Sequence, residues 1–174
     1  MTILENQELV NRLKAIKILI VDVDGVMTDG RLHFSKGGSC SRVYHVKDGY
    51  GLKVLLKSGI DVAVISASMS EDLKIRFEGL GIKDVLLGSE DKVSQYEKLK
   101  QQKSFEDSEA CFIGDELFDI PLLEKVGLSV TVPHAVDAVK KRVNYVTQFE
   151  GGQGAVREVS DAIRISQQIG PYLD

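Results

Sequence analysis

The chain has 174 residues, of which 43% are hydrophobic, and a formal net charge of −4. This size and composition predict a single domain, residues 1–174, that can bury a substantial core. The acidic balance argues against a nucleic-acid partner, and no apolar run approaches the roughly 18 residues that span a bilayer. Cys40 and Cys111 form no CxxC pair, so neither a zinc site nor a disulfide framework is indicated, and we expect a cytoplasmic protein.

Short apolar runs rich in β-branched residues alternate with segments of helical spacing along the chain. The expected strands are 16–23, 61–66, 84–87, 110–113, 128–132 and 145–147, and the expected helices are 7–15, 51–57, 71–78, 92–101, 117–125, 136–142 and 155–168. Strands that are apolar on both faces are typical of a parallel sheet covered by helices on both sides. The sequence therefore predicts a doubly wound, Rossmann-like α/β fold.

One segment interrupts this alternation. Between the first strand and the helix at 51–57, the β-rich stretches LHF and RVYHV flank a turn-forming run at 35–39, so a β-hairpin is predicted over about 31–46. An insert directly after the first strand projects from the carboxyl edge of the sheet, where open α/β sheets bind ligands. We expect the hairpin to cover the site or to pair with another subunit.

Polar residues stand at or just beyond the carboxyl ends of the first four strands. They are Asp22 and Asp24 after the first, Ser66 after the second, Lys92 at the helix after the third, and Asp115 after the fourth. Because the carboxyl ends of parallel strands meet at one edge of the sheet, these side chains are expected to converge.

Carboxylates that cluster without histidine or cysteine suit Mg²⁺. We expect Asp22, Asp115 and the backbone carbonyl of Asp24 to bind the metal, and Asp119, one helical turn beyond Asp115, to support it from behind. With the metal and the Lys92 ammonium neutralising the phosphoryl oxygens, a carboxylate can attack a phosphate ester and form an aspartyl-phosphate. Asp22 is the candidate nucleophile.

Asp24 is placed to act as acid and base. It can protonate the departing alcohol and then remove a proton from the water that hydrolyses the intermediate. Gly25 permits a sharp turn after it, and the Ser66 hydroxyl can donate to a phosphoryl oxygen. The residues themselves thus predict a magnesium-dependent phosphatase, although Ser66 could also simply cap the next helix and Lys92 could be a surface lysine.

The glycine-rich run at 151–154 has a superficial likeness to a phosphate-binding loop. It lacks the lysine of a P-loop and follows no dinucleotide-binding pattern, so we interpret it as a flexible lead into the last helix.

These motifs, in this order, resemble the haloacid dehalogenase superfamily. They are Asp22-Val23-Asp24-Gly25 followed by Val26-Met27-Thr28, Ser66 after an apolar strand, Lys92, and Gly114-Asp115-Glu116-Leu117-Phe118-Asp119. The hairpin insert, the run DGYG at 48–51 and the ending GGQGAVREV at 151–159 resemble one branch, the 3-deoxy-D-manno-octulosonate 8-phosphate phosphatases. The resemblance covers nearly the whole chain.

This resemblance implies a homotetramer in which the hairpins of four subunits assemble and one subunit helps to close its neighbour's site. It also implies a role in making the sugar acid of lipopolysaccharide, with a small sugar phosphate as substrate. The implied substrate contacts are Asp24, His45, Val46, Lys47, Asp48, Gly49, Lys53, Ser66, Ser68, Arg76 and Lys92.

Several positions depart from the branch pattern. His45 replaces an asparagine, and Lys47 and Lys53 replace arginines, which keeps the charge but loses the bidentate fork. Ser66-Ala67-Ser68 stands where Thr-Gly-Arg is expected, and Gln153 replaces a further arginine.

Three functions therefore remain open. The first is a phosphatase of 3-deoxy-D-manno-octulosonate 8-phosphate. The second is a phosphatase of a related ester, such as a sialic-acid-type 9-phosphate or an amino-sugar phosphate. The third is a non-catalytic phospho-aspartate binding module.

Overall fold

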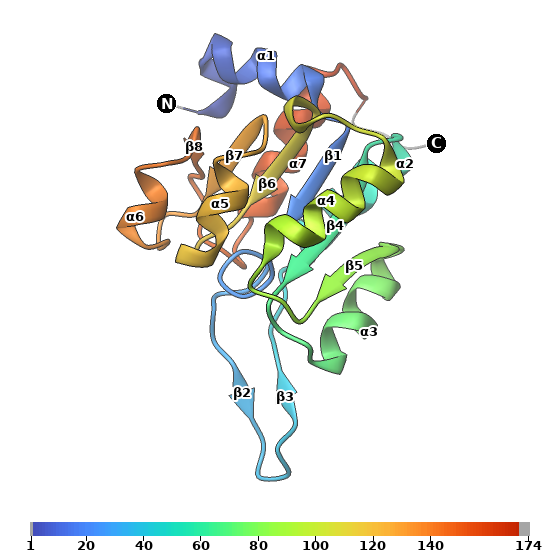
Figure 1. Ribbon diagram of the computed structural model, residues 1–174, viewed down its shortest axis with the longest axis vertical. Coiled ribbons are helices and arrows are strands. Elements are labelled where there is room, and N and C mark those ends of the chain that lie inside the picture. Colours follow the sequence, from blue (N-terminus) through green and yellow to red (C-terminus); the bar gives the residue numbers. More distant parts are fainter. Residues whose placement is uncertain (1, 171–174) are drawn as a thin grey trace.

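The computed structural model describes residues 2–170, and in this part of the chain six strands form one parallel sheet with the order β5-β4-β1-β6-β7-β8 (Figure 1). The strands are β1 (Ile18–Val21), β4 (Asp61–Ser66), β5 (Asp84–Leu87), β6 (Ala110–Ile113), β7 (Leu128–Thr131) and β8 (Tyr145–Val146). In the central strand, Ile20 lies opposite Ala63 of β4 and Phe112 of β6. The predicted parallel sheet is confirmed, and each of its strands lies within its expected range.

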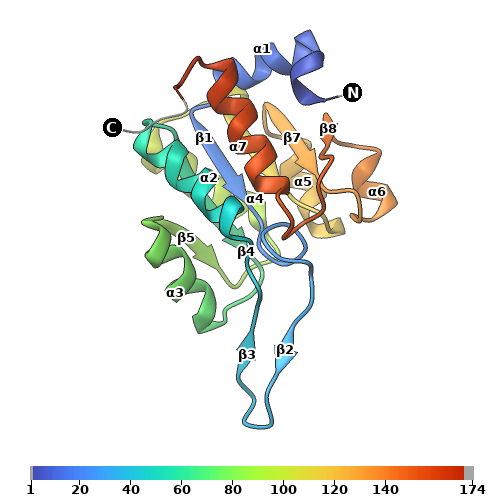
Figure 2. The same ribbon diagram turned by 180° about the vertical axis from the view of Figure 1, so that it is seen from behind.

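Helices cover both faces of the sheet, as the opposite views in Figures 1 and 2 show. One face packs against α1 (Gln7–Ala15), α2 (Val46–Lys57), α3 (Glu71–Leu80) and α7 (Ala155–Ser166), and the other packs against α4 (Lys92–Lys103), α5 (Ile120–Leu123) and α6 (Asp137–Lys140). Short 3-10 turns, η1 (Ile3–Glu5), η2 (Asp107–Glu109) and η3 (Leu117–Asp119), complete the elements described. The doubly wound arrangement is therefore as predicted.

The central strand explains why its sequence is apolar throughout. Leu19 and Val21 are buried on the side of α2 and α7, whereas Ile18 and Ile20 are buried on the side of α4. Successive side chains of a strand point to opposite faces, so a strand buried on both faces needs apolar residues at every position.

The hairpin is present, but its second strand lies earlier than expected. β2 (His33–Phe34) pairs antiparallel with β3 (Cys40–Ser41), and RVYHV is not a strand. Instead, α2 already begins at Val46 rather than at residue 51. A distant contact holds this first turn, because the buried Asp48 carboxylate accepts hydrogen bonds from the backbone N–H groups of Gly154 and Arg157.

Two further helices differ from expectation. The segment expected as one helix over 117–125 is divided into η3 and α5, with Pro121 in the first turn of α5, where its missing N–H costs nothing. The helix expected over 136–142 is shortened to α6.

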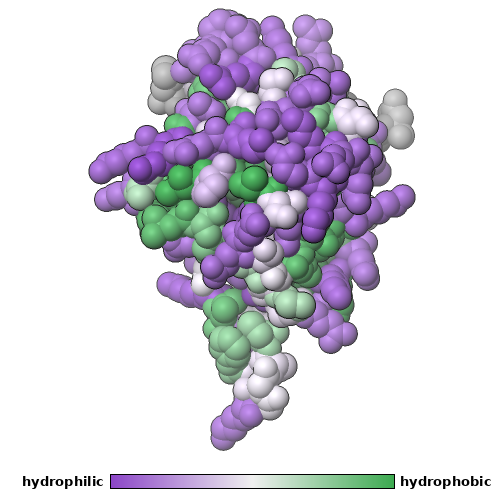
Figure 3. Space-filling model, viewed as in Figure 1, coloured by the Kyte–Doolittle hydropathy of each residue, from purple (hydrophilic) through white to green (hydrophobic). Residues whose placement is uncertain are grey.

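The hairpin projects from the carboxyl edge of the sheet as an arm of its own (Figures 1 and 2). Hydrophobic residues cover much of this arm, and its tip is hydrophilic (Figure 3). Phe34 and Val43 are 70% and 68% exposed. Within residues 2–170, no helix has both the length and the apolar character needed to cross a membrane.

Candidate active site

The chain leaves β1 into a tight loop that carries the first motif. The backbone N–H of Asp22 donates to Ile113 and continues the ladder between β1 and β6, so the Asp22 side chain is fixed at the end of a central strand. Gly25 has a φ of +91°, and a Cβ there would collide with the carboxylate of Asp115. The buried Thr28 hydroxyl accepts the N–H groups of Gly25 and Gly30 at 3.3 and 3.2 Å, which closes the loop on itself.

Three carboxylates meet at this edge. One oxygen from each of Asp22, Asp115 and Asp119 lies within 4.8 Å of the others. The wholly buried Asp119 accepts hydrogen bonds from the backbone N–H groups of Asp115 and Glu116 at 2.9 and 3.0 Å, so it shapes the loop that presents Asp115. The structure therefore brings together the three aspartates that the sequence placed near the metal.

Lys92 is the first residue of α4, and it is buried beside this cluster. Its Nζ lies 2.9 Å from Asp22 Oδ1 and 2.5 Å from Asp119 Oδ1. Burial alone disfavours the charged ammonium, but the two carboxylates outweigh it and raise the pKa of Lys92 above its ordinary value. The alternative of a surface lysine is excluded.

In the absence of a metal, the surroundings of Asp22 and Asp115 shift both acids towards their protonated forms. Burial, with a contribution from Asp119 and against the influence of Lys92, raises the pKa of Asp22 to about 7. Burial, together with the charges of Asp22 and Asp119, raises the pKa of Asp115 to about 8. Three carboxylates facing one ammonium leave an excess of negative charge that a divalent cation would balance.

The donor set fits Mg²⁺. All the candidate ligands at this edge are oxygen atoms, and Mg²⁺ prefers carboxylate and carbonyl oxygens. Among the described residues, the buried Asp115 Oδ1 has no hydrogen-bond partner, which leaves it available to a cation.

The Asp24 side chain is bound by a residue that the sequence did not single out. Arg42, just after β3, donates from Nε and Nη2 to the two carboxylate oxygens of Asp24 at 2.6 and 2.9 Å. A charged residue near the foot of a hairpin carries no sequence signal for such a contact.

The second motif lies where β4 ends. Ser66 is buried, and its Oγ accepts the backbone N–H of Ser68 at 3.2 Å, so in this structure it shapes the turn that leads to α3. Ser68 Oγ lies 3.0 Å from Arg42 Nη2.

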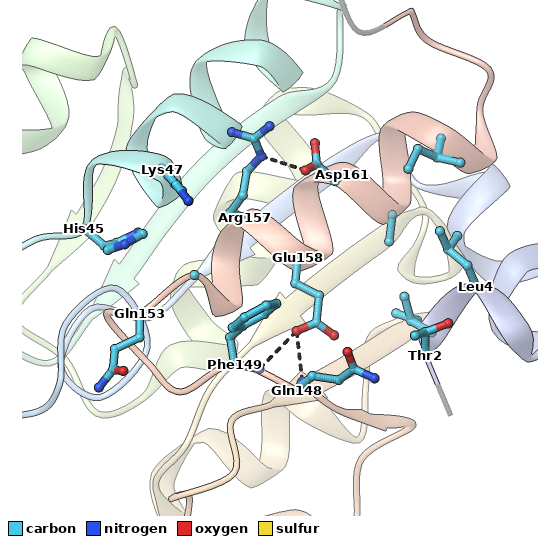
Figure 4. A pocket seen from close by; sticks show the side chains of 14 residues that line it. Thr2, Leu4, His45, Lys47, Gln148, Phe149, Gln153, Arg157, Glu158 and Asp161 are labelled. Carbon is cyan, nitrogen blue, oxygen red and sulfur yellow. Dashed lines mark hydrogen bonds and ion pairs between the residues drawn. The ribbon is translucent and has the colours of Figure 1, made fainter.

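The residues that the resemblance assigned to substrate binding are divided between several places. His45 and Lys47 line a cavity of about 600 Å³ together with Phe149, Gln153 and Arg157 (Figure 4). The three carboxylates do not line this cavity.

Other members of that set lie nearer to α3 or face solvent. Gly49 is buried against the guanidinium of Arg76, which lies 5.1 Å from the centre of the Tyr44 ring. Val46 is 81% exposed. Lys53 lines a separate depression near the end of α3, and the structure does not bring it to the carboxylates.

Asp48 is fully buried, and both its carboxylate oxygens accept the backbone N–H groups that start α7. In the described structure this side chain joins α2 to α7 and is not open to a substrate.

The glycine-rich run before α7 is not a flexible lead, so that interpretation was wrong. The N–H of Gly152 donates to the carbonyl of Val26 at 3.0 Å. A Cβ at position 151 would collide with the carbonyl oxygen of Gly25. Glycine is needed here because the run packs directly on the loop that carries Asp22 and Asp24.

Known proteins share this arrangement. Residues 56–159 match the model of the haloacid dehalogenase-like hydrolase family. The 3-deoxy-D-manno-octulosonate 8-phosphate phosphatase KdsC of Yersinia pestis is 39% identical over 160 residues, which cover 92% of this chain and 86% of the relative. The protein of the same name from Escherichia coli K12 is 36% identical, covering 92% and 85%.

Solved structures agree with the sequence comparison. The crystal structure of the Yersinia pestis phosphatase superposes with a TM-score of 0.92 at 38% identity and covers 94% of this chain and 88% of its own. The phosphatase of the same name from Moraxella catarrhalis, in complex with magnesium, phosphate and a KDO molecule, gives a TM-score of 0.89 at 33% identity, with 91% of each chain covered. The chain therefore belongs to the haloacid dehalogenase-like hydrolases and, within them, to the family of the 3-deoxy-D-manno-octulosonate 8-phosphate phosphatases.

Proposed function

We propose that this protein is a Mg²⁺-dependent phosphatase that hydrolyses 3-deoxy-D-manno-octulosonate 8-phosphate to the free sugar acid and inorganic phosphate. The observation that carries the proposal is the position of Asp22 at the end of β1, with the carboxylates of Asp115 and Asp119 and the ammonium of Lys92 around it. The relatives that bear the name of this reaction match most of the chain.

The metal would be held by the side chains of Asp22 and Asp115 and by the backbone carbonyl of Asp24, with Asp119 orienting the Asp115 loop through its hydrogen bonds. Once bound, Mg²⁺ supplies positive charge against the phosphoryl oxygens and lets an anionic nucleophile approach an anionic ester.

In the first half of the reaction, a carboxylate oxygen of Asp22 attacks phosphorus. The new bond joins Asp22 to phosphorus, and the bond between phosphorus and the sugar oxygen breaks. Asp24 gives its proton to the departing sugar oxygen, so the sugar leaves as an alcohol. Lys92 keeps the Asp22 side chain in place through a contact of 2.9 Å.

In the second half, water attacks the phosphorus of the aspartyl-phosphate. Asp24 takes a proton from the water as its oxygen bonds to phosphorus, and the bond to Asp22 breaks. Inorganic phosphate leaves, and Asp24 is again protonated for the next turnover. Ser66, at the end of β4, would donate its hydroxyl to a phosphoryl oxygen in both halves.

Substitution of the nucleophile tests this mechanism. We expect Asp22→Asn to lose turnover, and Asp29→Asn, a change at an exposed aspartate that follows the same loop, to keep it. Rapid acid quench of the wild-type protein should trap a hydroxylamine-sensitive acyl phosphate that the Asp22→Asn variant lacks. A full Mg²⁺-dependent rate in that variant would show that the nucleophile is another group.

A panel of sugar phosphates decides the substrate. We expect the highest kcat/KM with the octulosonate 8-phosphate. Faster hydrolysis of a sialic-acid-type 9-phosphate or an amino-sugar phosphate would move the assignment to that ester, and the two serines and Gln153 that replace expected groups are the reason to include both. A stable phosphoprotein that never turns over would instead favour a phospho-aspartate binding module.

We also propose that the protein acts as a homotetramer in the cytoplasm, in the synthesis of the sugar acid of lipopolysaccharide. Support for assembly comes from the hairpin, whose exposed Leu32, Phe34 and Val43 form an apolar surface on a projecting arm. Cys40 and Cys111 are both unpaired thiols, which suits a reducing compartment.

A further inference from the structure

The side chain of Arg42 has almost no solvent exposure, although most residues around it in the hairpin segment are exposed. Its side chain is only 2% exposed. It follows β3 directly and lies between the loop that carries Asp24 and the loop that joins β4 to α3. A buried guanidinium needs acceptors for its charge and its hydrogen atoms.

One edge of the guanidinium binds the carboxylate of Asp24. Nε donates to Oδ1 at 2.6 Å and Nη2 donates to Oδ2 at 2.9 Å, which is the bidentate geometry that fixes the plane of a carboxylate. The Asp24 side chain nevertheless remains 33% exposed, so it is held from one side and open on another.

The other side of the guanidinium is itself anchored. Nη1 donates to Ser70 Oγ at 2.6 Å and to Asp72 at 3.0 and 3.1 Å, and Nη2 also donates to Ser68 Oγ at 3.0 Å. These acceptors lie at or just before the start of α3, a helix whose apolar residues pack in the core on one face of the sheet.

The next residue but one in the same extended segment makes a second contact with this helix. Tyr44 packs edge to face on Phe77 with ring centres 6.2 Å apart, and Arg76 lies over its ring. Residues 42 and 44 point to the same side of an extended chain. The segment that follows β3 therefore contacts α3 and its N-cap through two residues, Arg42 and Tyr44.

The hydrogen bonds of Arg42 distinguish two possible roles, which are to hold a protein carboxylate or to bind an anionic part of the substrate. A guanidinium has five N–H donors. Here Asp24 accepts two of them, and Ser68, Ser70 and Asp72 accept the other three. With every donor already used within the protein, Arg42 is arranged to hold a protein group and not to bind an anionic part of the substrate.

The small side chain at position 68 is part of this arrangement. The resemblance leads to an arginine there, whereas in this chain Ser68 accepts one of the hydrogen bonds of Arg42. In this chain, the positive charge next to Ser66-Ala67-Ser68 is therefore supplied by Arg42, which follows β3 of the hairpin.

We propose that Arg42 is a positioning residue for the reaction: it holds the Asp24 carboxylate in the orientation from which that group exchanges protons with the leaving alcohol and with water. The inference rests on the proposed function, because it assigns Arg42 a role through Asp24. It also makes the foot of the hairpin part of the catalytic machinery, since Arg42 joins the hairpin to the loop after β1.

The test compares Arg42→Gln and Arg42→Lys with the wild-type enzyme on the octulosonate 8-phosphate and on an aryl phosphate. Misplacement of a catalytic group by about 1 Å can cost on the order of 100-fold. We therefore expect kcat to fall about 10- to 100-fold in Arg42→Gln and less in Arg42→Lys, which keeps the charge and loses the fork. KM and the Mg²⁺ concentration for half-maximal activity should stay within about 2-fold, because the metal carboxylates are untouched.

Arg142→Lys serves as the control, because this arginine lies on the exposed surface and pairs with Glu124. A double-mutant cycle then separates positioning from a general loss of structure. Once Asp24→Asn has removed the proton-exchanging group, adding Arg42→Gln should lower the remaining kcat by less than about 2-fold. Thermal unfolding of each variant checks that it is folded.

The outcomes are distinct. A wild-type enzyme inactive on both esters overturns the proposed function and, with it, this inference. An active wild type overturns the inference alone if Arg42→Gln keeps full kcat, if it raises KM at unchanged kcat, which would show substrate binding, or if its loss simply multiplies that of Asp24→Asn. Loss of kcat at constant KM, absent in the Asp24→Asn background, supports it.

Discussion

Two lysines of α4 each bridge two carboxylates, but the side chain of one is buried and that of the other is partly exposed. Lys92 bridges Asp22 and Asp119 with its side chain fully buried, and Lys103, at the other end of the helix, bridges Asp61 and Asp84 with its side chain 28% exposed. Water and ions screen the second bridge but not the first. The pair therefore isolates the effect of burial on an ion pair within one helix.

We expect the two lysines to differ in stability when each is replaced. Lys92→Met leaves two buried carboxylates without their cation and should lower the free energy of unfolding by about 3 kcal/mol. Lys103→Met should cost at most about 1 kcal/mol, because its carboxylates regain water. Urea denaturation in the presence of a chelator measures both. Equal losses would mean that the buried bridge contributes no more than a surface one.

The raised pKa values of the acidic cluster give a second prediction at this scale. Folding raises the pKa of Asp22 from 3.8 to about 7 and that of Asp115 from 3.8 to about 8, mainly through burial. The folded, metal-free protein therefore holds more protons than the unfolded chain above about pH 4, and the contribution of these groups to stability falls as the pH rises towards 8. A bound cation removes this loss, because it takes the place of the protons.

Added Mg²⁺ should thus raise Tm more at pH 8.5 than at pH 6, where protons compete with it for the carboxylates. Comparison with and without metal at each pH cancels the other titrating groups. Differential scanning fluorimetry measures the effect, and Asp115→Asn, which removes one of the competing charges, should flatten it. A Mg²⁺-induced shift that is larger at pH 6 would contradict the assignment of these acids to the metal.

At the scale of elements, the glycine run before α7 supports the loop after β1 by direct backbone packing. Gly151→Ala would place a methyl group against the carbonyl of Gly25. We expect a stability loss of about 1–3 kcal/mol and a fall in kcat, because the loop that must shift carries the nucleophile. Gly79→Ala is the control, since nothing lies within 4 Å of that position in α3. It should raise stability by about 0.5–1 kcal/mol. Urea denaturation and steady-state kinetics measure both variants, and full activity in Gly151→Ala would show that the loop tolerates the shift.

The same elements show what the sequence could and could not predict. The strands were predictable because β1, β4 and β6 are buried on both faces and therefore read as apolar runs. The start of α2 was not, because its first turn is held by a contact between Asp48 and the backbone of α7, more than 100 residues away in sequence. Local propensity carries no information on such a contact.

The active site likewise has a part that could be predicted from the sequence and a part that could not. Asp22, Lys92 and Asp115 could be predicted to converge because parallel strands bring their carboxyl ends to one edge. The contact between Arg42 and Asp24 could not be predicted, since it depends on how the segment after β3 packs against the start of α3. The packing of Gly151 on Gly25 likewise depends on two loops meeting in space.

At the scale of the whole molecule, the hairpin projects from the carboxyl edge of the sheet (Figure 1), which is also the edge where Asp22 and Asp115 follow β1 and β6. A partner subunit that packed on this apolar arm would lie at the carboxyl edge of the sheet. Phe34 is 70% exposed on the arm, together with the exposed Leu32 and Val43, and a patch of exposed apolar side chains is typical of an interaction surface. Assembly through the arm, as proposed, would therefore place a partner subunit near the acidic cluster.

A charge on the arm should therefore disrupt assembly. We expect Phe34→Asp to shift the protein from a tetramer to smaller species, because a buried, unpaired carboxylate in each hairpin would oppose association. Ile75→Asp makes the same change at an equally prominent apolar residue, 67% exposed on α3, and should leave the mass unchanged. Sedimentation velocity over a range of protein concentrations distinguishes the two. If Phe34→Asp keeps the wild-type mass, the hairpin does not hold the subunits together, and a monomeric wild type would rule out the tetramer itself.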